Sequence, residues 1–293
     1  MRSLLFVPGD SEKKLEKGFA SEADVVIVDL EDSVAPANKE AARRIASDFL
    51  AAGTGTRKPL AYIRVNDLST DLTDEDRAAL AGVHPDGIML PKATGGADVQ
   101  QLSAKLRVHE ANHGLRDGSI SIIAIATETA ASLFSGATYA GASARLAGLT
   151  WGAEDLSAAI GARSARDAEG RYTDVFRLAR TVTLLAASSA EVSAIDSVYP
   201  DFRDHAGLEA ECAEAERDGF TAKMAIHPAQ VPVINAAFTP SAEAIEHSAA
   251  VVAAFEAAGN PGVVGIGGKM YDRPHLRLAE RLLARARAAG EIS

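Results

Sequence analysis

The sequence predicts an α/β protein built as a (β/α)8 barrel with a C-terminal helical extension. Short apolar, β-prone runs alternate with helix-like stretches along most of the chain, as in successive βαβ units. Eight such units in a row favour a closed barrel over an open doubly wound sheet, which is the alternative. No Pro-rich linker, low-complexity segment or sequence repeat divides the units. The runs cover 3–7, 24–29, 60–65, 87–91, 120–126, 146–151, 194–198 and 222–226.

The first four runs each end in polar or turn-forming residues. The first leads into the turn 8–10, and the second is an unbroken β-branched run followed by the acidic segment 29–32. The third ends at Arg64, and the fourth is followed by Lys92. Because the carboxyl ends of parallel strands share one edge of a sheet, we expect these residues to lie on one rim of the barrel.

The last four runs continue the pattern. The fifth precedes Glu128, the sixth precedes Asp155, and the eighth precedes His227 and Pro228. After it come a helical stretch over 241–258, a Gly-rich turn over 262–268 and a helix over 274–289. A barrel needs only one further helix. We therefore expect a catalytic barrel domain over 1–238 and an extension over 239–293 that caps the barrel or a neighbouring subunit.

Composition excludes several classes of protein. The 293 residues carry a formal net charge of −10 and only 5% aromatic residues, which argues against nucleic-acid binding. The single cysteine, Cys212, cannot form an internal disulfide, as is typical of a reducing, cytoplasmic setting. The apolar run at the N-terminus is too short for a signal peptide or a membrane span. We therefore expect a cytoplasmic protein without membrane or nucleic-acid partners.

Two carboxylates one βα repeat apart are the most informative feature of the chain. Glu128 and Asp155 each follow an apolar run and precede a helix-like stretch, so both should project from the carboxyl edge of neighbouring strands. Acidic residues also occur at helix starts for the sake of the helix dipole alone. For the pair together we favour a Mg²⁺ site, because Mg²⁺ takes oxygen ligands and keeps open positions for water and substrate.

Other residues at this rim suggest substrate contacts. Acids in the segment 29–32, Glu31 and Asp32 among them, could order the water shell of a metal. Arg64 could clamp a substrate carboxylate or could pair structurally with those acids, and the sequence leaves both interpretations open. Lys39 belongs to a local group of basic residues that could grip phosphates, although solvated helix faces look the same.

The segment from His109 to His113 matches the H-E-x-x-H pattern of zinc proteases, but it is not expected to be a metal site. It lies at the end of the helix that precedes the fifth strand, which places it at the amino-terminal rim, opposite the expected active face. We expect surface histidines that interact favourably with the helix C-terminus.

Taken in colinear order over nearly the whole chain, several motifs resemble the citrate lyase β-subunit-like family. This family lies within the HpcH/HpaI aldolase superfamily, and its relatives include malyl-CoA and citramalyl-CoA lyases. The motifs are Phe6-Val7-Pro8-Gly9-Asp10, Asp29-Leu30-Glu31-Asp32-Ser33-Val34 with Lys39 and Arg43, Arg64-Val65-Asn66, Leu90-Pro91-Lys92, Glu128-Thr129-Ala130, Gly152-Ala153-Glu154-Asp155-Leu156, Ile226-His227-Pro228-Ala229-Gln230 and Met270-Tyr271-Asp272-Arg273-Pro274.

The resemblance implies a TIM barrel, Mg²⁺ as cofactor and reversible carbon–carbon cleavage of 3-hydroxyacyl thioesters. By matching motif, Glu128 and Asp155 would bind Mg²⁺, Arg64 would bind the substrate carboxylate and act in catalysis, and Asp272 of a neighbouring subunit would be the acid/base. The same matching places Glu31, Asp32, Lys39 and Pro228 among the substrate-binding residues. Thr127 departs from the Ile that many members carry there, and we expect no effect on the metal because the carboxylate that follows is retained.

The expected function is a Mg²⁺-dependent carbon–carbon lyase that cleaves a 3-hydroxyacyl-CoA of the malyl-CoA or citramalyl-CoA type to a 2-oxo acid and acetyl-CoA. One alternative is a citrate lyase β subunit that acts on an acyl-carrier-protein thioester within a complex. Another is an aldolase that acts on a free 2-oxo acid. The expected assembly is a homo-oligomer, a trimer or a hexamer. The acyl chain, the stereochemistry and the choice of thioester carrier do not follow from the sequence.

Overall fold

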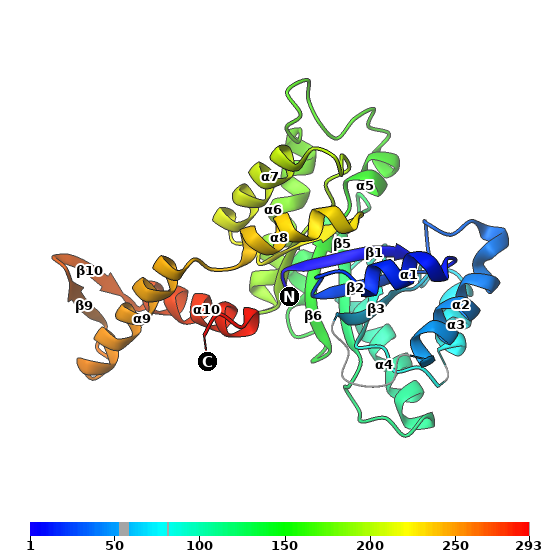
Figure 1. Cartoon of the computed structure of the whole chain (residues 1–293), viewed down its shortest axis with the longest axis horizontal. Coiled ribbons are helices and arrows are strands. Elements are labelled where there is room, and N and C mark those ends of the chain that lie inside the picture. Colours follow the sequence, from blue (N-terminus) through cyan, green and yellow to red (C-terminus); the bar gives the residue numbers. More distant parts are fainter. Residues whose placement is uncertain (53–58, 81, 293) are drawn as a thin grey trace.

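The computed structural model describes residues 1–52, 59–80 and 82–292, and its centre is a closed barrel of parallel strands (Figure 1). Each strand pairs with the next in sequence order, and the last pairs with the first through Leu4 opposite Met224. The prediction of a (β/α)8 barrel is therefore confirmed. The strands are β1 (Ser3–Pro8), β2 (Val25–Asp29), β3 (Leu60–Arg64), β4 (Gly87–Leu90), β5 (Ser121–Thr127), β6 (Leu146–Trp151), β7 (Ser193–Asp196) and β8 (Ala222–Ala225).

Helices surround the barrel, but they are distributed unevenly among the crossovers. The connection from β5 to β6 contains only short 3₁₀ turns, whereas the connection from β6 to β7 contains two α-helices. The α-helices of this layer are α1 (Glu12–Phe19), α2 (Lys39–Ala52), α3 (Leu72–Ala79), α4 (Gly96–Asn112), α5 (Ala153–Ile160), α6 (Asp174–Ser189), α7 (His205–Asp218) and α8 (Val231–Phe238). The 3₁₀ turns are η1 (Pro36–Asn38), η2 (Ser132–Phe134), η3 (Gly136–Tyr139) and η4 (Pro228–Gln230).

Two apolar layers hold the barrel together. Alternate residues of each strand point into the barrel or out toward the helices, so a strand buried on both faces is apolar throughout. In β2, Val25 and Ile27 belong to the inner layer, while Val26 and Val28 belong to the layer under the helices. This double burial explains the unbroken β-branched run seen in the sequence. The buried residues of the inner layer are Leu4, Val25, Ile27, Tyr62, Met89, Ile123, Ile125, Ile195, Ala222 and Met224.

A buried ionic network ties the outer wall of the barrel to its helices. Asp196 at the end of β7 accepts a hydrogen bond of 2.9 Å from Lys223 of β8, and another of 2.9 Å from the indole of Trp151. Lys223 also donates to Glu211 of α7 at 2.8 Å, and Arg180 of α6 donates to Asp196 at 3.1 Å. Burying charges costs free energy unless each is paired, and here each has partners. The network fixes β6, β7 and β8 against α6 and α7.

The extension after α8 consists of α9 (Ala242–Ala257), β9 (Val263–Ile266), β10 (Lys269–Asp272) and α10 (Arg273–Ala289). The two strands form an antiparallel hairpin, so the expected Gly-rich turn is in fact β structure over most of its length. Gly267 and Gly268 connect the strands with φ of 56° and 77°. A two-residue hairpin turn of this kind requires positive φ at both positions, which glycine adopts without strain.

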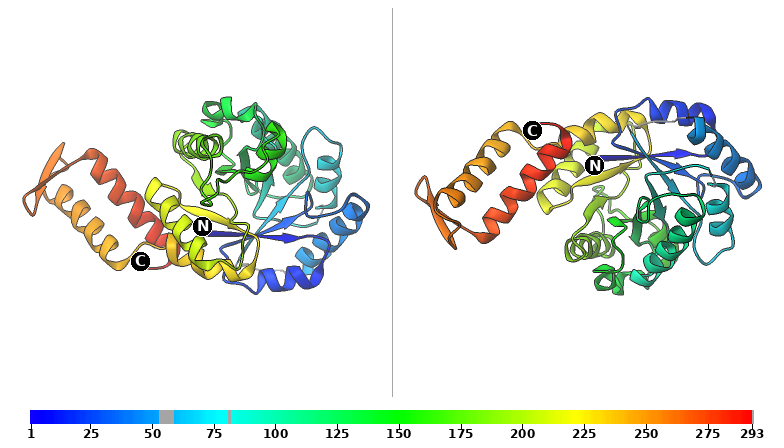
Figure 2. Two further views of the ribbon diagram at one scale, coloured as in Figure 1. Left: turned by 90° about the horizontal axis from the view of Figure 1, so that it is seen from above. Right: turned by 90° about the horizontal axis from the view of Figure 1, so that it is seen from below.

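The extension has its own small apolar core and projects from the barrel, as both views in Figure 2 show. Phe255 of α9 packs there with Val264 of β9 and Leu276 of α10. Near its C-terminal end α10 approaches α7, where Arg285 pairs with Glu216 at 3.1 Å. The hairpin lies at the end of the extension that is remote from the barrel (Figures 1 and 2). Over the part of the chain that the structure describes, every helix is too short or too polar to cross a bilayer.

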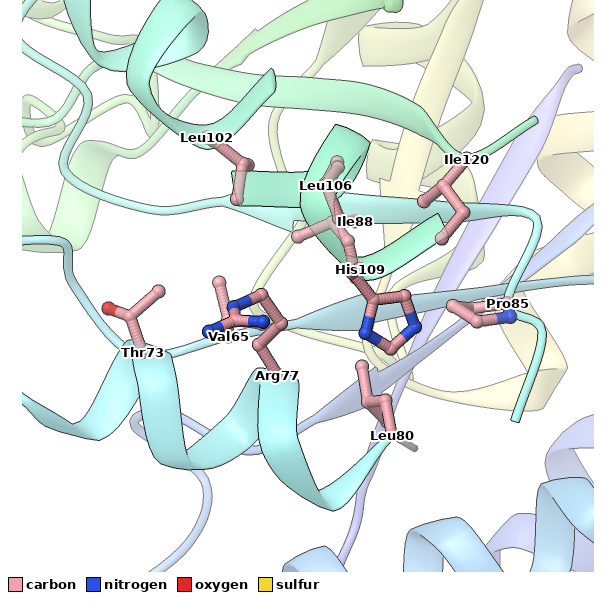
Figure 3. A pocket seen from close by; sticks show the side chains of 10 residues that line it. All are labelled: Val65, Thr73, Arg77, Leu80, Pro85, Ile88, Leu102, Leu106, His109 and Ile120. Atoms are coloured by element: carbon pink, nitrogen blue, oxygen red, sulfur yellow. The ribbon is translucent and has the colours of Figure 1, made fainter. Parts of the chain in front are cut away.

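The H-E-x-x-H segment has a structural role. Glu110 accepts two hydrogen bonds from the guanidinium of Arg145, at 2.7 and 2.6 Å, and a third of 2.9 Å from the backbone N–H of Ile120. His109 lines a small cavity between α3 and α4 (Figure 3) and is buried, whereas His113 is exposed. The expectation of two surface histidines was therefore wrong for His109. Its ring fills apolar space between the two helices.

Glu110 should make the stability of the protein depend on pH. Burial alone would raise the pKa of Glu110, but the hydrogen bonds from Arg145 and from backbone N–H groups outweigh it and lower the pKa to about 2. A lowered carboxyl pKa stabilises the fold above the ordinary value of 4.5, and this contribution is lost as the pH falls from there toward 2. Glu110→Gln should reduce the free energy of unfolding at pH 7 by about 3 kcal/mol, as expected when a buried ion pair loses one partner.

The check is urea unfolding of the wild type and of Glu110→Gln between pH 7 and pH 3. The difference between the two should be constant above pH 5 and should shrink below the ordinary carboxyl pKa. A difference that stays the same at every pH would mean that the charge of Glu110 contributes nothing to stability.

Candidate active site

The two carboxylates proposed as metal ligands lie at the carboxyl edge of neighbouring strands. Glu128 follows β5 directly and is 2% exposed, and Asp155 lies in the first turn of α5, just after β6. Gly152 lies behind Glu128: a Cβ atom there would be 2.9 Å from Glu128 Cγ and 3.0 Å from its Oε1. Only glycine leaves room for the glutamate in this position.

Lys92 connects the two carboxylates. Its backbone N–H donates to Glu128 Oε2 at 2.5 Å, and its Nζ lies 3.7 Å from Asp155 Oδ1. Lys92 follows β4 with φ of 51°, a left-handed conformation that is uncommon for residues other than glycine. This conformation lets one residue direct both its backbone N–H and its ammonium group toward the acidic pair.

The surroundings of Glu128 disfavour its negative charge, despite the contacts with Lys92. Burial raises the pKa of Glu128 well above its usual value, and the negative charge of Asp155 raises it further. Among the described residues no three His, Cys, Asp or Glu side chains form a metal-binding group, so a complete protein cage is absent there. Mg²⁺ does not require one, because it is usually held by one or two carboxylates, with water and substrate in the other positions. The donor set of Glu128 and Asp155 therefore fits Mg²⁺.

Arg64 lies at the end of β3 and binds two acids of the β2 loop. It donates to both carboxylate oxygens of Asp29, at 2.8 and 2.7 Å, and its Nη1 lies 2.9 Å from Glu31 Oε2. These contacts show the structural pairing that the sequence left open. Each terminal nitrogen of a guanidinium carries a second N–H, so the pairing does not exhaust its donors. We call the rim formed by the carboxyl ends of the strands the mouth of the barrel. Arg64 is held rigidly at this mouth, and among the residues that the structure describes, two of its N–H groups remain free to donate hydrogen bonds.

Glu31 and Asp32 differ in their surroundings. Glu31 is buried and pairs with the ammonium group of Lys92 as well as with Arg64. Burial raises the pKa of Glu31, and the positive charge of Arg64 opposes that rise. Asp32 is exposed, and its carboxylate lies 3.5 Å from Lys92 Nζ. Glu31 therefore orients the cations of the mouth, and Asp32 faces solvent.

Lys39 is not arranged to grip a phosphate, as the sequence suggested it could. Its Nζ donates to the backbone carbonyls of Leu30 and Glu31, both at 2.8 Å, and to Asn66 Oδ1 at 2.7 Å. An ammonium group has three N–H donors, and these three acceptors engage all of them. In this structure Lys39 fixes the loop after β2, which carries Glu31.

Pro228 and Asp272 occupy very different places. Pro228 begins η4 after β8 and is exposed at the barrel mouth, next to His227, whose ring stacks on Phe202 with 4.6 Å between centroids. Asp272 ends β10 in the remote hairpin, so the chain does not bring it to its own acidic pair. Its carboxylate lies 2.5 Å from His275 Nδ1.

Within its own chain Asp272 is partly exposed and ionisable. Its side chain is 44% exposed, and the hydrogen bond with His275 lowers the pKa of Asp272. The isolated chain therefore does not give Asp272 the surroundings of a general acid.

Sequence reasoning missed the roles of Lys92 and Gly152. In the sequence Lys92 was a polar residue after the fourth strand and part of one family motif, and neither observation reveals its positive φ. Gly152 stands between a strand and an acidic helix start, which is a signal for close approach of the backbone to a neighbouring group.

The chain is similar along nearly its whole length to proteins of known sequence and structure. The chain is 38% identical over 282 residues to the citrate lyase subunit beta-like protein of Mycobacterium tuberculosis, covering 96% of this chain and 94% of that protein. It is 35% identical over 290 residues to a (3S)-malyl-CoA thioesterase of Cereibacter sphaeroides, covering 98% and 95%. The crystal structure of CitE from M. tuberculosis with magnesium, acetoacetate and coenzyme A superposes with a TM-score of 0.78 at 37% identity, covering 98% of both chains.

The profile of one protein family matches residues 2–228, which is the whole barrel from β1 to the start of η4. The matched range spans β3, β5 and β6, whose carboxyl ends carry Arg64, Glu128 and Asp155. The chain belongs to the HpcH/HpaI aldolase/citrate lyase family.

Proposed function

We propose that the protein is a Mg²⁺-dependent lyase that reversibly cleaves a 3-hydroxyacyl-CoA of the malyl-CoA or citramalyl-CoA type into a 2-oxo acid and acetyl-CoA. The observation that carries this proposal is the pair Glu128 and Asp155, which lies in a barrel mouth whose cations, Arg64 and Lys92, are held by acids. Magnesium with coenzyme A and a small oxo acid in the solved M. tuberculosis relative supports it.

The reaction needs one bond to break and one proton to move. In the cleavage direction the 3-hydroxyl loses its proton and becomes the carbonyl of the 2-oxo acid. The bond between carbons two and three breaks, and its electron pair forms a thioester enolate, which is then protonated at carbon to give acetyl-CoA. Mg²⁺ on Glu128 and Asp155 would act as a Lewis acid toward the oxygens of the oxo-acid half.

Residues around the pair would position the substrate. The second N–H groups on the terminal nitrogens of Arg64 can hydrogen-bond the carboxylate of the oxo-acid half, and its pairing with Asp29 preorganises it for this. Lys92 Nζ lies near both Glu31 and Asp155, so it can stabilise negative charge that develops beside them. We propose that Asp32 and Pro228, exposed at the same mouth, contact the acyl or carrier part of the thioester.

The enolate carbon requires a carboxylic acid close by, and we propose Asp272 of a second copy for this role. In its own chain Asp272 is remote from the mouth and ionised, which suits neither proton donation nor contact with the substrate. Insertion into the mouth of another subunit would desolvate the carboxyl group and raise its pKa. In the condensation direction the same carboxylate would take a proton from the methyl group of acetyl-CoA.

Replacing Arg64 by lysine should separate substrate binding from structure. Lysine keeps the charge but loses the planar fork, so the KM for the oxo acid in condensation should rise about 10- to 100-fold, the equivalent of one or two charge-assisted hydrogen bonds. Arg43→Lys is the matched control, because Arg43 of α2 pairs with buried Asp76 at 2.7 Å on the outer side of the barrel wall. It should lower the melting temperature and leave the KM unchanged. A rise in KM no larger for Arg64→Lys than for Arg43→Lys would remove Arg64 from the substrate site.

The proposed function is tested by incubating the protein and Mg²⁺ with acetyl-CoA or propionyl-CoA and a panel of 2-oxo acids, glyoxylate and pyruvate among them, with detection of adducts by mass spectrometry. A 3-hydroxyacyl-CoA adduct that needs Mg²⁺ supports the proposal. An adduct that forms only with a loaded acyl carrier protein would favour the β-subunit alternative. Condensation of free oxo acids without any thioester would favour the aldolase.

We propose further that the active form is a homo-oligomer, a trimer or a hexamer, and that residues 239–293 form a unit distinct from the barrel domain of residues 1–238. The separate apolar core of α9, β9, β10 and α10 supports this division.

A further inference from the structure

A β-bulge near the end of β5 changes which side of the barrel wall its last residues face. Ile125 of β5 is paired with Thr150 of β6. The next paired residue of β5 is Thr127, opposite Trp151, so β5 carries one extra residue, Ala126. Because side chains alternate along a strand, one extra residue reverses the alternation beyond it. Residues after the bulge therefore face the side opposite to the one that strict alternation would give.

The contacts of the residues around the bulge show this reversal. Ile125 belongs to the inner layer of the barrel, and Ala126 belongs to the layer under the helices. Strict alternation would turn Thr127 inward and Glu128 outward. Instead the hydroxyl of Thr127 contacts α6 on the outer side, and the carboxylate of Glu128 accepts the hydrogen bond from the Lys92 backbone N–H at the mouth. The bulge thus places the carboxylate, and not the hydroxyl, at the mouth.

A buried hydrogen bond holds Thr127 on the outer side. Its Oγ1 lies 2.8 Å from Oγ1 of Thr183 in α6 and 3.4 Å from the carbonyl oxygen of Ala179. Thr183 Oγ1 donates its only proton to the same carbonyl at 3.0 Å, so toward Thr127 it acts as the acceptor. Both threonines are buried, and a buried hydroxyl that loses its partner destabilises the arrangement that contains it. The pair therefore favours the outward position of Thr127.

We propose that Thr127 and Thr183 are positioning residues for Glu128. This inference rests on the proposed function in one respect, which is that Glu128 binds Mg²⁺. Both threonines lie on the helix side of the barrel wall, where they attach the bulge to α6, and Glu128 is the residue that follows the bulge. Each hydroxyl has its partner in the other, so this role is compatible with the expectation that Thr127, in place of Ile, leaves the metal unaffected.

Losing one hydroxyl should displace Glu128 more than losing both. In Thr183→Val the hydroxyl of Thr127 keeps only the more distant carbonyl of Ala179, and it gains a better hydrogen bond only when the backbone at the bulge shifts. Glu128 follows directly on that backbone. In the double variant Thr127→Val/Thr183→Val, two apolar side chains of the original shape meet, and no hydroxyl is left without a partner. We therefore expect a displaced Glu128 in the single variant and its original position in the double variant.

Hydrogen exchange in the metal-free protein reports the position of Glu128 without any ligand. The Lys92 backbone N–H donates to Glu128, so its exchange, followed by mass spectrometry of peptides that contain residue 92, measures this contact. Exchange should be about 10-fold faster in Thr183→Val than in the wild type. It should keep the wild-type rate in the double variant and in Thr183→Ser, which retains the hydroxyl.

Ser3→Ala is the matched control. Ser3 is buried at the start of β1, at the opposite rim of the barrel, and its hydroxyl donates to Asn235 at 2.7 Å. Removing this hydroxyl should lower the melting temperature without changing the exchange of the Lys92 amide. The control therefore separates a general loss of stability from a displacement of Glu128.

Titration with Mn²⁺, which prefers the same oxygen ligands as Mg²⁺, measures the consequence for the metal. The electron paramagnetic resonance signal of free Mn²⁺ should give a Kd about 10-fold weaker in Thr183→Val, and a wild-type Kd in Thr183→Ser and in the double variant. Wild-type exchange or a wild-type Kd in Thr183→Val would overturn the proposal, as would a double variant that behaves like the single one. The expected pattern of exchange in a protein that binds no Mn²⁺ would refute the metal site of the proposed function and support the positioning of Glu128.

Discussion

Glu128→Gln and Asp155→Asn should each abolish Mg²⁺-dependent turnover, with a loss of at least about 100-fold, because Lewis-acid stabilisation contributes several kcal/mol to the transition state. The fold should persist. Glu128 is buried beside Asp155, so a neutral amide of the same shape removes like-charge repulsion and should not lower the melting temperature of the metal-free protein.

Thermal melts with and without Mg²⁺ separate metal binding from folding. Mg²⁺ that binds only the folded state raises the melting temperature of the wild type, and this rise should vanish in both variants. Glu154→Gln is the matched control: Glu154 precedes Asp155 on the same helix, about 100° round the axis, and its side chain should not face the metal. A wild-type response to Mg²⁺ in Glu128→Gln or Asp155→Asn would exclude that residue as a ligand.

The barrel was predictable because its strands are buried on both faces. The run 146–151 was predicted at the bounds of β6, and the other runs differ from their strands by a few residues. The hairpin of β9 and β10 was missed, because the glycines that suggested a flexible turn belong to short strands and to their two-residue connection. Glycine signals a special backbone conformation without saying whether strands flank it.

The positions of the site's carboxylates could be predicted from the sequence. The contacts of its cationic side chains could not. Strand ends converge on one rim in any barrel, so the neighbourhood of Glu128 and Asp155 followed from the alternation of elements. Whether a long cationic side chain is free to contact substrate depends on hydrogen-bond acceptors that are distant in the sequence. Lys39 is engaged by carbonyls of Leu30 and Glu31 and by Asn66, and no spacing rule anticipates such contacts.

Asp272→Asn should remove turnover while preserving the response of the melting temperature to Mg²⁺. It should also stop exchange of the acetyl-CoA methyl protons with solvent, because a neutral amide cannot take a proton. The extension should stay folded, since Asp272 occupies the N-cap of α10 and asparagine is an equally favourable N-cap residue. Unchanged proton exchange in the variant would show that Asp272 is not the base.

Mixing Asp272→Asn with Glu128→Gln should then restore activity, because each variant supplies what the other lacks. A mouth of the Asp272→Asn chain retains Glu128 and Asp155, and it becomes complete when it receives the hairpin of a Glu128→Gln chain. At equal, random mixing about a quarter of the mouths have this combination, so activity should recover to about a quarter of the wild type. Mixing Glu128→Gln with Asp155→Asn is the control: both lesions lie in the mouth itself, and no arrangement of subunits repairs it. Native mass spectrometry shows whether the subunits exchange. If they exchange and the activity stays at the level of the separate variants, Asp272 serves no neighbouring barrel.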